Sequence, residues 1–470
     1  MRTTPIIFWF RRDLRLGDHP GLTAAIATGR PIIPVFIHDE LVESHGAASK
    51  WRLGLAVEHF AKTLDGIGSR LTLRRGNALD VLQKLVAETG AETVYWSRAY
   101  DPASIARDKV VKATLKEDGV EAKSHQGHLL FEPWTVATKT GGFYKVFTPM
   151  WKAVRTSTLA SSLAPTKHLL APDDWPNSDT IETWKMAAPM KRGADIVAKH
   201  VCVGEDAANK RLTSFINDKI NNYTQGRNFP SADNTSRLSE NLTYGEISPR
   251  TCWHAGWRAL RDGKSDAETF LKELVWREFA YHLAYHTPRI VTDNWNPQWD
   301  SFPWRGDGEH TLRWKQGRTG VQMVDAAMRE MYVTGTMHNR GRMIVASYLT
   351  KHMMTHWNVG LDWFAECLID WDPAANAMGW QWTAGSGPDA APYFRIFNPD
   401  TQAEKFDNGG EYRAKFIAEL YSNQTPQALD YFEAIPKSWN LKPSDPYPQP
   451  LVPITVGRQL ALDAYKNRLA

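Results

Sequence analysis

Continuous apolar runs alternate with helix-like segments over the first 130 residues. The runs are Ile6–Phe10, Ile32–Ile37, Leu71–Leu73 and Thr93–Trp96. Strands that alternate with helices are typical of a parallel α/β sheet. Neither a Gly-x-Gly-x-x-Gly turn nor a Walker-type loop accompanies them, which argues against an ordinary dinucleotide site. We therefore predict a Rossmann-like parallel α/β domain over residues 1–130.

The pattern changes twice beyond that domain. Over residues 131–203 proline and serine are frequent and apolar periodicity is weak, which is typical of a connector between domains. Over residues 204–470 helical spacing dominates, so we expect an all-helical C-terminal domain. Ser248 and Pro249 predict a helix start, and Ser265–Glu268 predict a capping box for a helix that runs to about Leu283.

Composition narrows the class of protein. A chain of 470 residues is too long for one ordinary core. Its net charge of +4 and pI near 8.7 permit DNA binding without demanding it. The three cysteines lie far apart and indicate neither a disulfide framework nor a zinc or iron–sulfur site. With no signal peptide and no run of about 18 apolar residues, we expect a soluble cytoplasmic protein without a membrane partner.

Two short motifs in the helical domain carry polar chemistry. On a helix, Asn339, Arg342 and Met343 share one face, because residues three and four apart are neighbours. Asp370 and Asp372 supply a partner for the arginine and hydrogen-bond acceptors for a planar ligand with polar edges. Charges are seldom buried unless they are paired. A surface salt bridge on an ordinary helical domain is the alternative interpretation.

Another helix also combines charge with an aromatic side chain. Phe270, Glu273, Trp276 and Arg277 are spaced three and four apart and therefore share a face. A glutamate beside an aromatic ring and an arginine indicates a site, and an amphipathic helix with solvated charges is the alternative.

The hydroxyls, arginine and turn amides around Tyr223 and Thr235–Ser239 suit a pyrophosphate, although a helix cap fits them too. Twenty tryptophans suggest stacking surfaces or electron chemistry in addition to an aromatic core.

These stretches together resemble the photolyase/cryptochrome family, and most of all its bacterial cyclobutane pyrimidine dimer photolyases of class I or the sister class III. The resemblance is strongest at Phe8–Asp18, Glu273–Phe279, Met337–Met343 and Asp370–Trp382, and it covers essentially the whole chain. It implies a deoxyribodipyrimidine photo-lyase of bacterial type that acts as a monomer. In such an enzyme, reduced FAD excited by blue or near-UV light passes one electron to a flipped-out dimer, which then splits into two pyrimidines.

The resemblance implies a noncovalent FAD in the helical domain. Arg342, paired with Asp370, would favour the anionic reduced flavin, Asp372 would accept from the ring N3–H, and Asn376 would lie at N5. The implied FAD contacts are Tyr223, Thr235, Ser236, Arg237, Leu238, Ser239, Phe270, Asn339, Arg342, Asp370, Trp371, Asp372 and Asn376.

The implied partner is UV-damaged DNA that contains cyclobutane pyrimidine dimers. Trp276 and Trp382 would form two walls around the flipped dimer, and Glu273 would hydrogen-bond the pyrimidine edge and steady the radical anion when protonated. The remaining implied lesion or DNA contacts are Arg227, Arg277, Asn339, Arg340, Met343 and Gln402.

Three tryptophans match the family's electron relay to oxidised flavin. Trp380 would lie nearest the flavin, Trp357 next, and Trp304 at the surface. With Glu273, Asn376 and Met343 they make up the implied catalytic set.

An antenna chromophore is also expected in the α/β domain. Folate-binding members of the family have an Asn-Glu pair after a tyrosine, whereas here Tyr100 is followed by Ser104 and Ile105 at that place. A folate in that particular pocket is therefore not indicated. A differently placed folate, a deazaflavin and a second flavin stay open.

Three other functions are alternatives to dimer repair. A (6-4) photolyase would have histidine in place of Met343. A light-sensing cryptochrome tends to lose the aromatic pair or to carry a long tail, and plant and insect forms have aspartate or cysteine in place of Asn376. A basic helical DNA-binding scaffold would leave the Asp370–Trp382 grouping unexplained.

Overall fold

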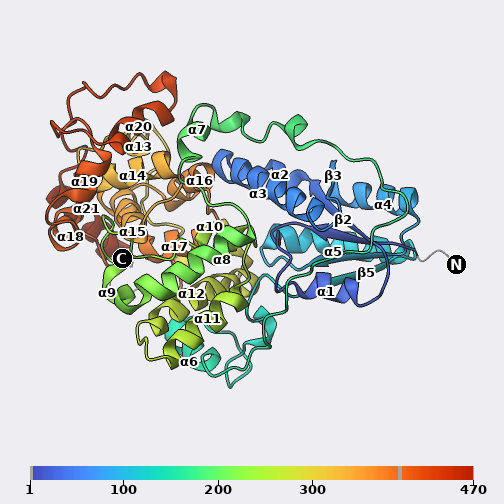
Figure 1. The fold of residues 1–470 in the computed structure, drawn as a ribbon. Helices are drawn as coiled ribbons and strands as arrows, with labels where there is room; N and C mark the ends of the chain where they lie inside the picture. The colour runs from blue at the N-terminus through green and yellow to red at the C-terminus, as the bar shows by residue number, and fades with distance from the viewer. Residues whose placement is uncertain (1–3, 390–393, 469–470) are drawn as a thin grey trace.

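A five-stranded sheet forms the first part of the chain in the computed structural model, which describes residues 4–389 and 394–468 (Figure 1). The strands are β1 (Ile6–Phe10), β2 (Ile32–His38), β3 (Thr72–Arg75), β4 (Thr93–Ser97) and β5 (Glu121–His125). They are parallel throughout and follow the order β3-β2-β1-β4-β5. The predicted α/β sheet is thus confirmed.

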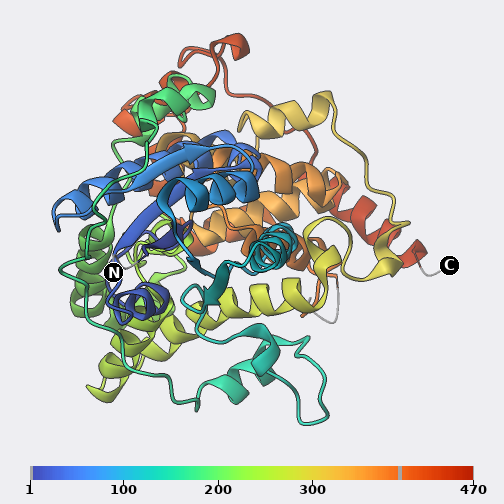
Figure 2. The same ribbon diagram turned by 90° about the vertical axis from the view of Figure 1, so that its right-hand side faces the viewer.

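The sheet is buried on both faces. Successive side chains of a strand point to opposite sides, so each strand contributes to two cores. In β1, Ile6, Phe8 and Phe10 pack into one apolar core, while Ile7 and Trp9 pack into another. Helices α1 and α3 cover the first face, and α4 and α5 cover the second (Figure 2). The helices of this domain are α1 (Pro20–Ile26), α2 (Glu40–Glu43), α3 (Ala47–Asp65), α4 (Ala78–Thr89) and α5 (Pro102–Glu117).

The connector runs back along the α/β domain before it joins the helices, as the green segment of Figure 1 shows. The amide of Asp18 donates to Leu163 O at 3.0 Å, and that of Ile32 donates to Leu170 O at 2.9 Å. Its short helices are the 3-10 turns Pro133–Thr135, Ile181–Trp184 and Ala188–Met190, with α6 (Phe147–Val154) and α7 (Gly193–Val197).

Helices make up the rest of the chain. The longest is α12 (Ala267–His286), and it packs against α11 (Pro249–Arg261) and α17 (Pro373–Ala384). The other α-helices are α8 (Glu205–Ser214), α9 (Tyr223–Gly226), α10 (Ser239–Thr243), α13 (Glu309–Lys315), α14 (Gln322–Thr334), α15 (Asn339–Ser347), α16 (Trp357–Cys367), α18 (Pro399–Phe406), α19 (Glu411–Phe416), α20 (Pro426–Ala434) and α21 (Ile454–Asn467).

Short 3-10 and π-helical turns join these helices. They are Phe215–Lys219, Ile220–Asn222, Pro288–Val291, Pro297–Trp299, Tyr348–His352 and Lys437–Trp439.

The two predicted helix starts have different outcomes. Ser248 caps α11 as expected, since its hydroxyl accepts from the Thr251 amide at 2.9 Å. The capping box at Ser265–Glu268 was wrong, because α12 has Asp266 at its N-cap without a side-chain cap bond. The Asp266 carboxylate instead accepts from the Thr224 amide at 3.0 Å. A tertiary contact has thus replaced the local cap.

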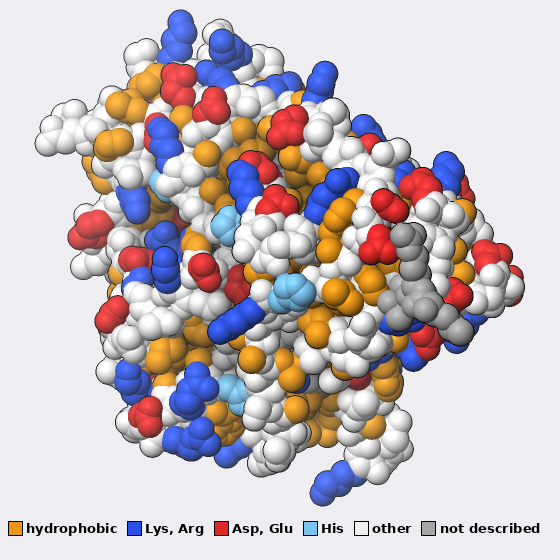
Figure 3. All heavy atoms as spheres, turned by 45° about the vertical axis from the view of Figure 1, so that its right-hand side comes forward, with side chains coloured by type: hydrophobic (Ala, Val, Ile, Leu, Met, Phe, Trp, Pro, Cys, Tyr) orange, Lys and Arg blue, Asp and Glu red, His pale blue; other side chains and the backbone are white. Residues whose placement is uncertain are grey.

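The charged run that follows β1 forms a network at the junction of the two domains. The Arg15 guanidinium donates to Gly245 O at 3.0 Å, and Asp18 pairs with Arg250. Figure 3 shows Lys and Arg interspersed with Asp and Glu over the face it presents, in keeping with the small net charge. No helix within residues 4–389 and 394–468 is both long and apolar enough to cross a membrane.

Candidate functional site

The ion pair predicted between α15 and the segment before α17 is present. Both carboxylate oxygens of Asp370 accept from Arg342 Nη2, at 2.9 and 2.7 Å. The Asp370 side chain is 2% exposed and that of Arg342 is 29% exposed. Because Arg342 Nε donates to Met337 O at 2.8 Å, the guanidinium is fixed in position while part of it stays open to a ligand.

Asp372 begins α17 and is held from two sides. Its Oδ1 caps the helix by accepting from the amides of Ala374 and Ala375 at 3.1 and 2.9 Å. Its Oδ2 accepts from the Tyr281 hydroxyl of α12 at 2.5 Å. One turn along α17, the Asn376 amide donates to Leu361 O at 3.0 Å. These groups provide the acceptors and the cation that the polar edge of a flavin ring requires.

The residues expected to hold the pyrophosphate lie near α9, α10 and α12. Tyr223 is buried, and its ring meets Phe215 and Phe270 edge-on or tilted, with centroids 5.0 to 6.4 Å apart. Thr235 and Ser236 are half-buried, Arg237 and Ser239 are exposed, and Leu238 is buried. Arg237 has a left-handed backbone (φ 52°) and its side chain pairs with Asp233. Hydroxyls thus stand beside a cation in this turn, as an anion site requires.

Glu273 and Trp276 occupy the expected face of α12. Glu273 Oε1 pairs with Arg227 Nη1 at 2.5 Å. Burial raises the pKa of Glu273, and the Arg227 guanidinium opposes that rise. A half-buried carboxyl with a raised pKa is suited to hold a proton and donate a hydrogen bond once a ligand covers it.

Trp276 stacks on Phe147 of the connector, with ring centroids 3.9 Å apart and planes within 3°. The Phe147 amide donates to Asp389 Oδ2 at 3.3 Å, and the Trp382 indole donates to Asp389 O at 3.1 Å. Asp389 therefore links the two tryptophans that were predicted as walls. Nearby on α15, the Asn339 amide contacts Met343 Sδ at 3.8 Å.

The arginines predicted to touch DNA take different positions. Arg340 lies over the Phe406 ring at 4.0 Å and bonds Asn228 and Gln402, which places it with Gln402 of α18. Arg277 is directed inward instead, donates to His128 O at 2.9 Å, and is 13% exposed. Its guanidinium is taken up by a structural contact, so we leave it out of the DNA contacts proposed below.

Two of the three predicted relay tryptophans, Trp357 and Trp380, lie on the packed helices α16 and α17, and Trp304 lies in the loop before α13. Trp380 of α17 rests on Gly360 of α16, where an added Cβ would come within 2.0 Å of the ring, so only glycine fits. Gly360 is three residues after Trp357, which therefore faces the same side. His356 touches both Trp357 and Trp304, with centroids 5.4 and 5.1 Å apart.

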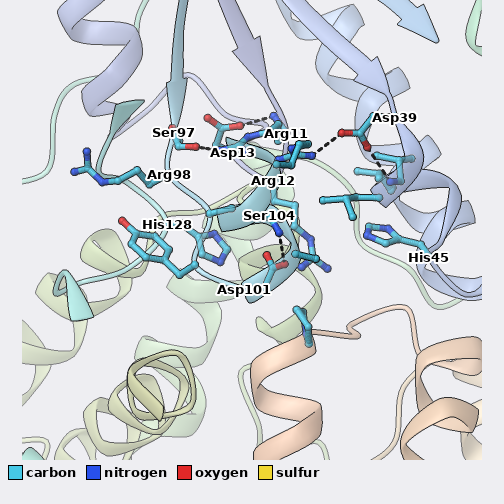
Figure 4. A pocket seen from close by; sticks show the side chains of 18 of the residues that line it. Arg11, Arg12, Asp13, Asp39, His45, Ser97, Arg98, Asp101, Ser104 and His128 are labelled. Carbon is cyan, nitrogen blue, oxygen red and sulfur yellow. Dashed lines mark hydrogen bonds and ion pairs between the residues drawn. The ribbon is translucent and has the colours of Figure 1, made fainter. Parts of the chain in front are cut away.

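A pocket between the two domains was not predicted as a site. Figure 4 shows strand ends of the α/β domain on one side of it and a helix of the helical domain on the other. Its lining includes Arg12, His45, Tyr281 and Trp371. Ser104, which departs from the folate pattern in the sequence, also lines this pocket.

Several buried polar atoms in this pocket have no partner among the described residues. Among them are Arg12 Nε, His45 Nδ1 and Trp371 Nε1. Burial, with a contribution from Arg12, lowers the pKa of His45 to about 3, so the imidazole is neutral. Unpaired buried polar groups are rare in proteins, and they suit a ligand with polar ring edges. Trp371, predicted as an FAD contact, lies against His45 at 5.5 Å in this pocket.

A hydrogen-bonded network joins the pocket to Asp372. His128 Nε2 lies 2.9 Å from Arg277 Nη2 and 3.1 Å from the Tyr281 hydroxyl, which donates to Asp372. Sequence reasoning missed His128 and Tyr281, because neither belongs to a local motif and their partners are more than 90 residues away.

Comparison with known proteins accounts for both domains. The family described as DNA photolyase matches residues 6–171, and the one described as FAD binding domain of DNA photolyase matches residues 270–467. A deoxyribodipyrimidine photo-lyase of Agrobacterium fabrum is 43% identical over 99% of this chain and 98% of its own length. One from Synechococcus sp. is 36% identical over 88% of each chain.

Two solved photolyase structures are also similar to this chain. A bacterial class III photolyase from Agrobacterium tumefaciens has a TM-score of 0.91 and 42% identity, covering 100% of this chain and 98% of that one. An archaeal photolyase from Sulfolobus tokodaii with two FAD molecules has a TM-score of 0.80 and 28% identity, covering 98% and 100%. These matches confirm the predicted fold class and the FAD-binding domain.

Proposed function

Because this chain belongs to the photolyase/cryptochrome family, we propose that it is a light-driven repair enzyme that splits cyclobutane pyrimidine dimers in DNA. The observation that carries the proposal is the placement of Trp276 and Trp382 beside Phe147 and Asp389, with Glu273 three residues before Trp276 on α12. Bound FAD, reduced and excited by light, would supply the one-electron chemistry that breaks both bonds between the pyrimidines and would regain the electron afterwards.

The chain's own residues hold and tune that chemistry. Arg342 places a fixed positive charge beside the flavin, which favours its anionic reduced form. Asp370 keeps that cation in place, Asp372 accepts from the ring edge, and Asn376 offers its carbonyl oxygen. Tyr223, Phe270 and the turn Thr235–Ser239 hold the remainder of FAD. Asn339 and Met343 of α15 complete the lesion side of the site.

Binding of the dimer depends on aromatic surface. Flipping a damaged pair costs a few kcal/mol, and stacking on an aromatic side chain returns about 1–3 kcal/mol per base. Trp276 and Trp382 offset the cost, and protonated Glu273 donates to the pyrimidine carbonyl. Arg227, Arg340 and Gln402 are the proposed DNA contacts, with phosphates as the target of the arginines, since such contacts position a protein without reading sequence.

Oxidised flavin is reduced through the tryptophan relay. Trp380 gives an electron to the photoexcited flavin, Trp357 refills Trp380, and Trp304 refills Trp357. The pocket between the domains takes an antenna chromophore, because its unpaired polar atoms suit a ring with polar edges. Folate, deazaflavin and a second flavin are the candidates. We further propose that the enzyme belongs to class III, like the similar photolyase from Agrobacterium tumefaciens. It would work in the cytoplasm and as a monomer, since one chain supplies every site residue named above.

The test is repair by purified, chemically reduced protein under blue light. Three duplexes are compared, with a cyclobutane thymine dimer, with a (6-4) photoproduct and without damage, each with a dark control. We expect light-dependent loss of the cyclobutane dimer alone. Repair of the (6-4) product would favour the rival photolyase, and bound FAD without any repair would favour a light-sensing cryptochrome.

A further inference from the structure

Trp304, the outermost of the three relay tryptophans, packs against further aromatic rings. The Trp304 ring is half-buried and stacks on Trp299, with centroids 5.6 Å apart and planes within 17°. Phe302 meets its other side at 4.6 Å, and its indole N–H donates to Thr350 O at 2.9 Å. Trp304 is thus half-buried and in contact with two further aromatic rings.

The aromatic path continues to the C-terminal helix. Trp299 is 4% exposed, and its ring centroid lies 6.1 Å from that of Tyr465 on α21. Tyr465 is half-buried and stacks on Phe394 at 4.5 Å. Of these outer rings, Trp299 and Tyr465 are oxidisable, whereas a phenylalanine ring is not under the same conditions. Electronic coupling falls steeply with distance, so stacked neighbours are the favoured route.

We propose that Trp299 and Tyr465 extend the relay, so that Tyr465 is its terminal donor. This inference rests on the proposed photoreduction by Trp380, Trp357 and Trp304. After Trp304 has refilled Trp357, Trp299 gives an electron to Trp304, and Tyr465 gives one to Trp299. Tyr465 loses its phenolic proton to water in the same step and becomes a neutral tyrosyl radical. An external thiol then restores the tyrosine by giving up a hydrogen atom.

The local charges explain why the proton must leave. The Arg468 guanidinium lies 3.7 Å from the Tyr465 ring centre and 4.7 Å from that of Trp299. A cation so close disfavours a positive charge on either ring. A neutral tyrosyl radical avoids that penalty, whereas a radical left on Trp299 retains it. Electrostatics therefore favours transfer of the radical from Trp299 to Tyr465, away from the flavin.

A second basic side chain, Lys351, lies in the same region. Its Nζ is 3.2 Å from the Phe394 ring centre and has no hydrogen-bond partner among the described residues. Burial lowers its pKa well below the usual range, and Arg468 acts in the same direction. Burial therefore disfavours a second full positive charge beside these rings.

The test uses the full-length protein with oxidised FAD and compares Trp299→Phe, Tyr465→Phe and Trp304→Phe. Trp439→Phe and Tyr421→Phe are matched controls, because both residues are half-buried and pack elsewhere in the helical domain. FAD content and circular dichroism verify folding. Transient absorption after a flash reports the tyrosyl radical and the lifetime of the charge-separated state, in H2O and in D2O.

We expect a tyrosyl signal in the parent protein whose rise slows in D2O, because the phenolic proton leaves in that step. Tyr465→Phe and Trp299→Phe should abolish the signal and shorten the charge-separated state severalfold, with repair by chemically reduced enzyme unchanged. A tyrosyl signal that survives in Tyr465→Phe, or lifetimes equal to those of the controls, would overturn the proposal. So would unchanged photoreduction in Trp304→Phe. Loss of repair in the reduced parent protein would instead count against the proposed function.

Discussion

The flavin-facing region of the helical domain and the pocket between the domains are built in different ways. The first depends on short segments in which neighbours along a helix share a face, such as Asn339, Arg342 and Met343. The second draws Arg12, His45 and Trp371 from positions far apart in the chain. Local spacing therefore predicts the first region, whereas the second becomes visible when the domains are packed together.

The largest effect is expected from a substitution in the flavin-facing region. Arg342→Ala leaves the Asp370 carboxylate, 2% exposed, without its partner. Removing one member of a buried pair costs about 3–5 kcal/mol. We expect most FAD to be lost on gel filtration and the thermal midpoint to drop. Arg289→Ala is the control, since it breaks an exposed pair with Asp300. Equal FAD retention in both variants would refute the role assigned to Arg342.

The next test concerns the domain junction, where Glu278 should make the stability of the protein depend on pH. Burial raises the pKa of Glu278 to about 7 from its ordinary 4.5, although Arg277 opposes the rise, and Glu278 accepts from the Leu130 and Phe131 amides. The unfolded chain loses this proton near pH 4.5, whereas the folded protein keeps it until about pH 7. Stability should therefore fall over that window, by up to about 3 kcal/mol, and level off above it.

Glu278→Gln should remove most of that fall, because glutamine still accepts from both amides but does not ionise. Urea midpoints at pH 5 and pH 8 measure the difference, with exposed Glu268→Gln as control. An unchanged pH dependence in Glu278→Gln would show that other groups cause it.

A smaller effect is expected at the lesion wall. Trp276→Ala should weaken binding of a dimer-containing duplex by about 1–3 kcal/mol while FAD stays bound. Trp276→Phe, which keeps a ring to stack on Phe147, should retain most of the affinity. Fluorescence anisotropy with damaged and undamaged duplexes gives both values. Full affinity in the alanine variant would remove Trp276 from the lesion site.

The smallest effect concerns the link between the regions. Tyr281→Phe removes the donor to Asp372 and should cost about 1–2 kcal/mol of folding stability, with a modest loss of FAD. Thermal unfolding and FAD absorbance per protein measure it. A loss of FAD as complete as in Arg342→Ala would mean that the two regions act as one.

Much of the fold followed from local pattern. Buried strands such as β1 appear in the sequence as continuous apolar runs, because both faces of the sheet are covered. Strand β5 (Glu121–His125) was missed because it is polar, with Glu121 and Lys123 exposed at the sheet edge. The capping box predicted at Ser265–Glu268 does not form, because Asp266 is the N-cap and its carboxylate accepts from the Thr224 amide instead. His128 and Tyr281 were missed since their contacts arise from tertiary packing.

The measurement that tests the central claim most directly is single-flash repair. Chemically reduced protein, bound to a duplex with one cyclobutane thymine dimer, receives one blue flash, and thymine recovery is followed by absorbance. We predict thymine formation that matches dimer loss, with none in the dark. A protein that holds FAD and binds the dimer, yet forms no thymine after the flash, would contradict the proposed repair function.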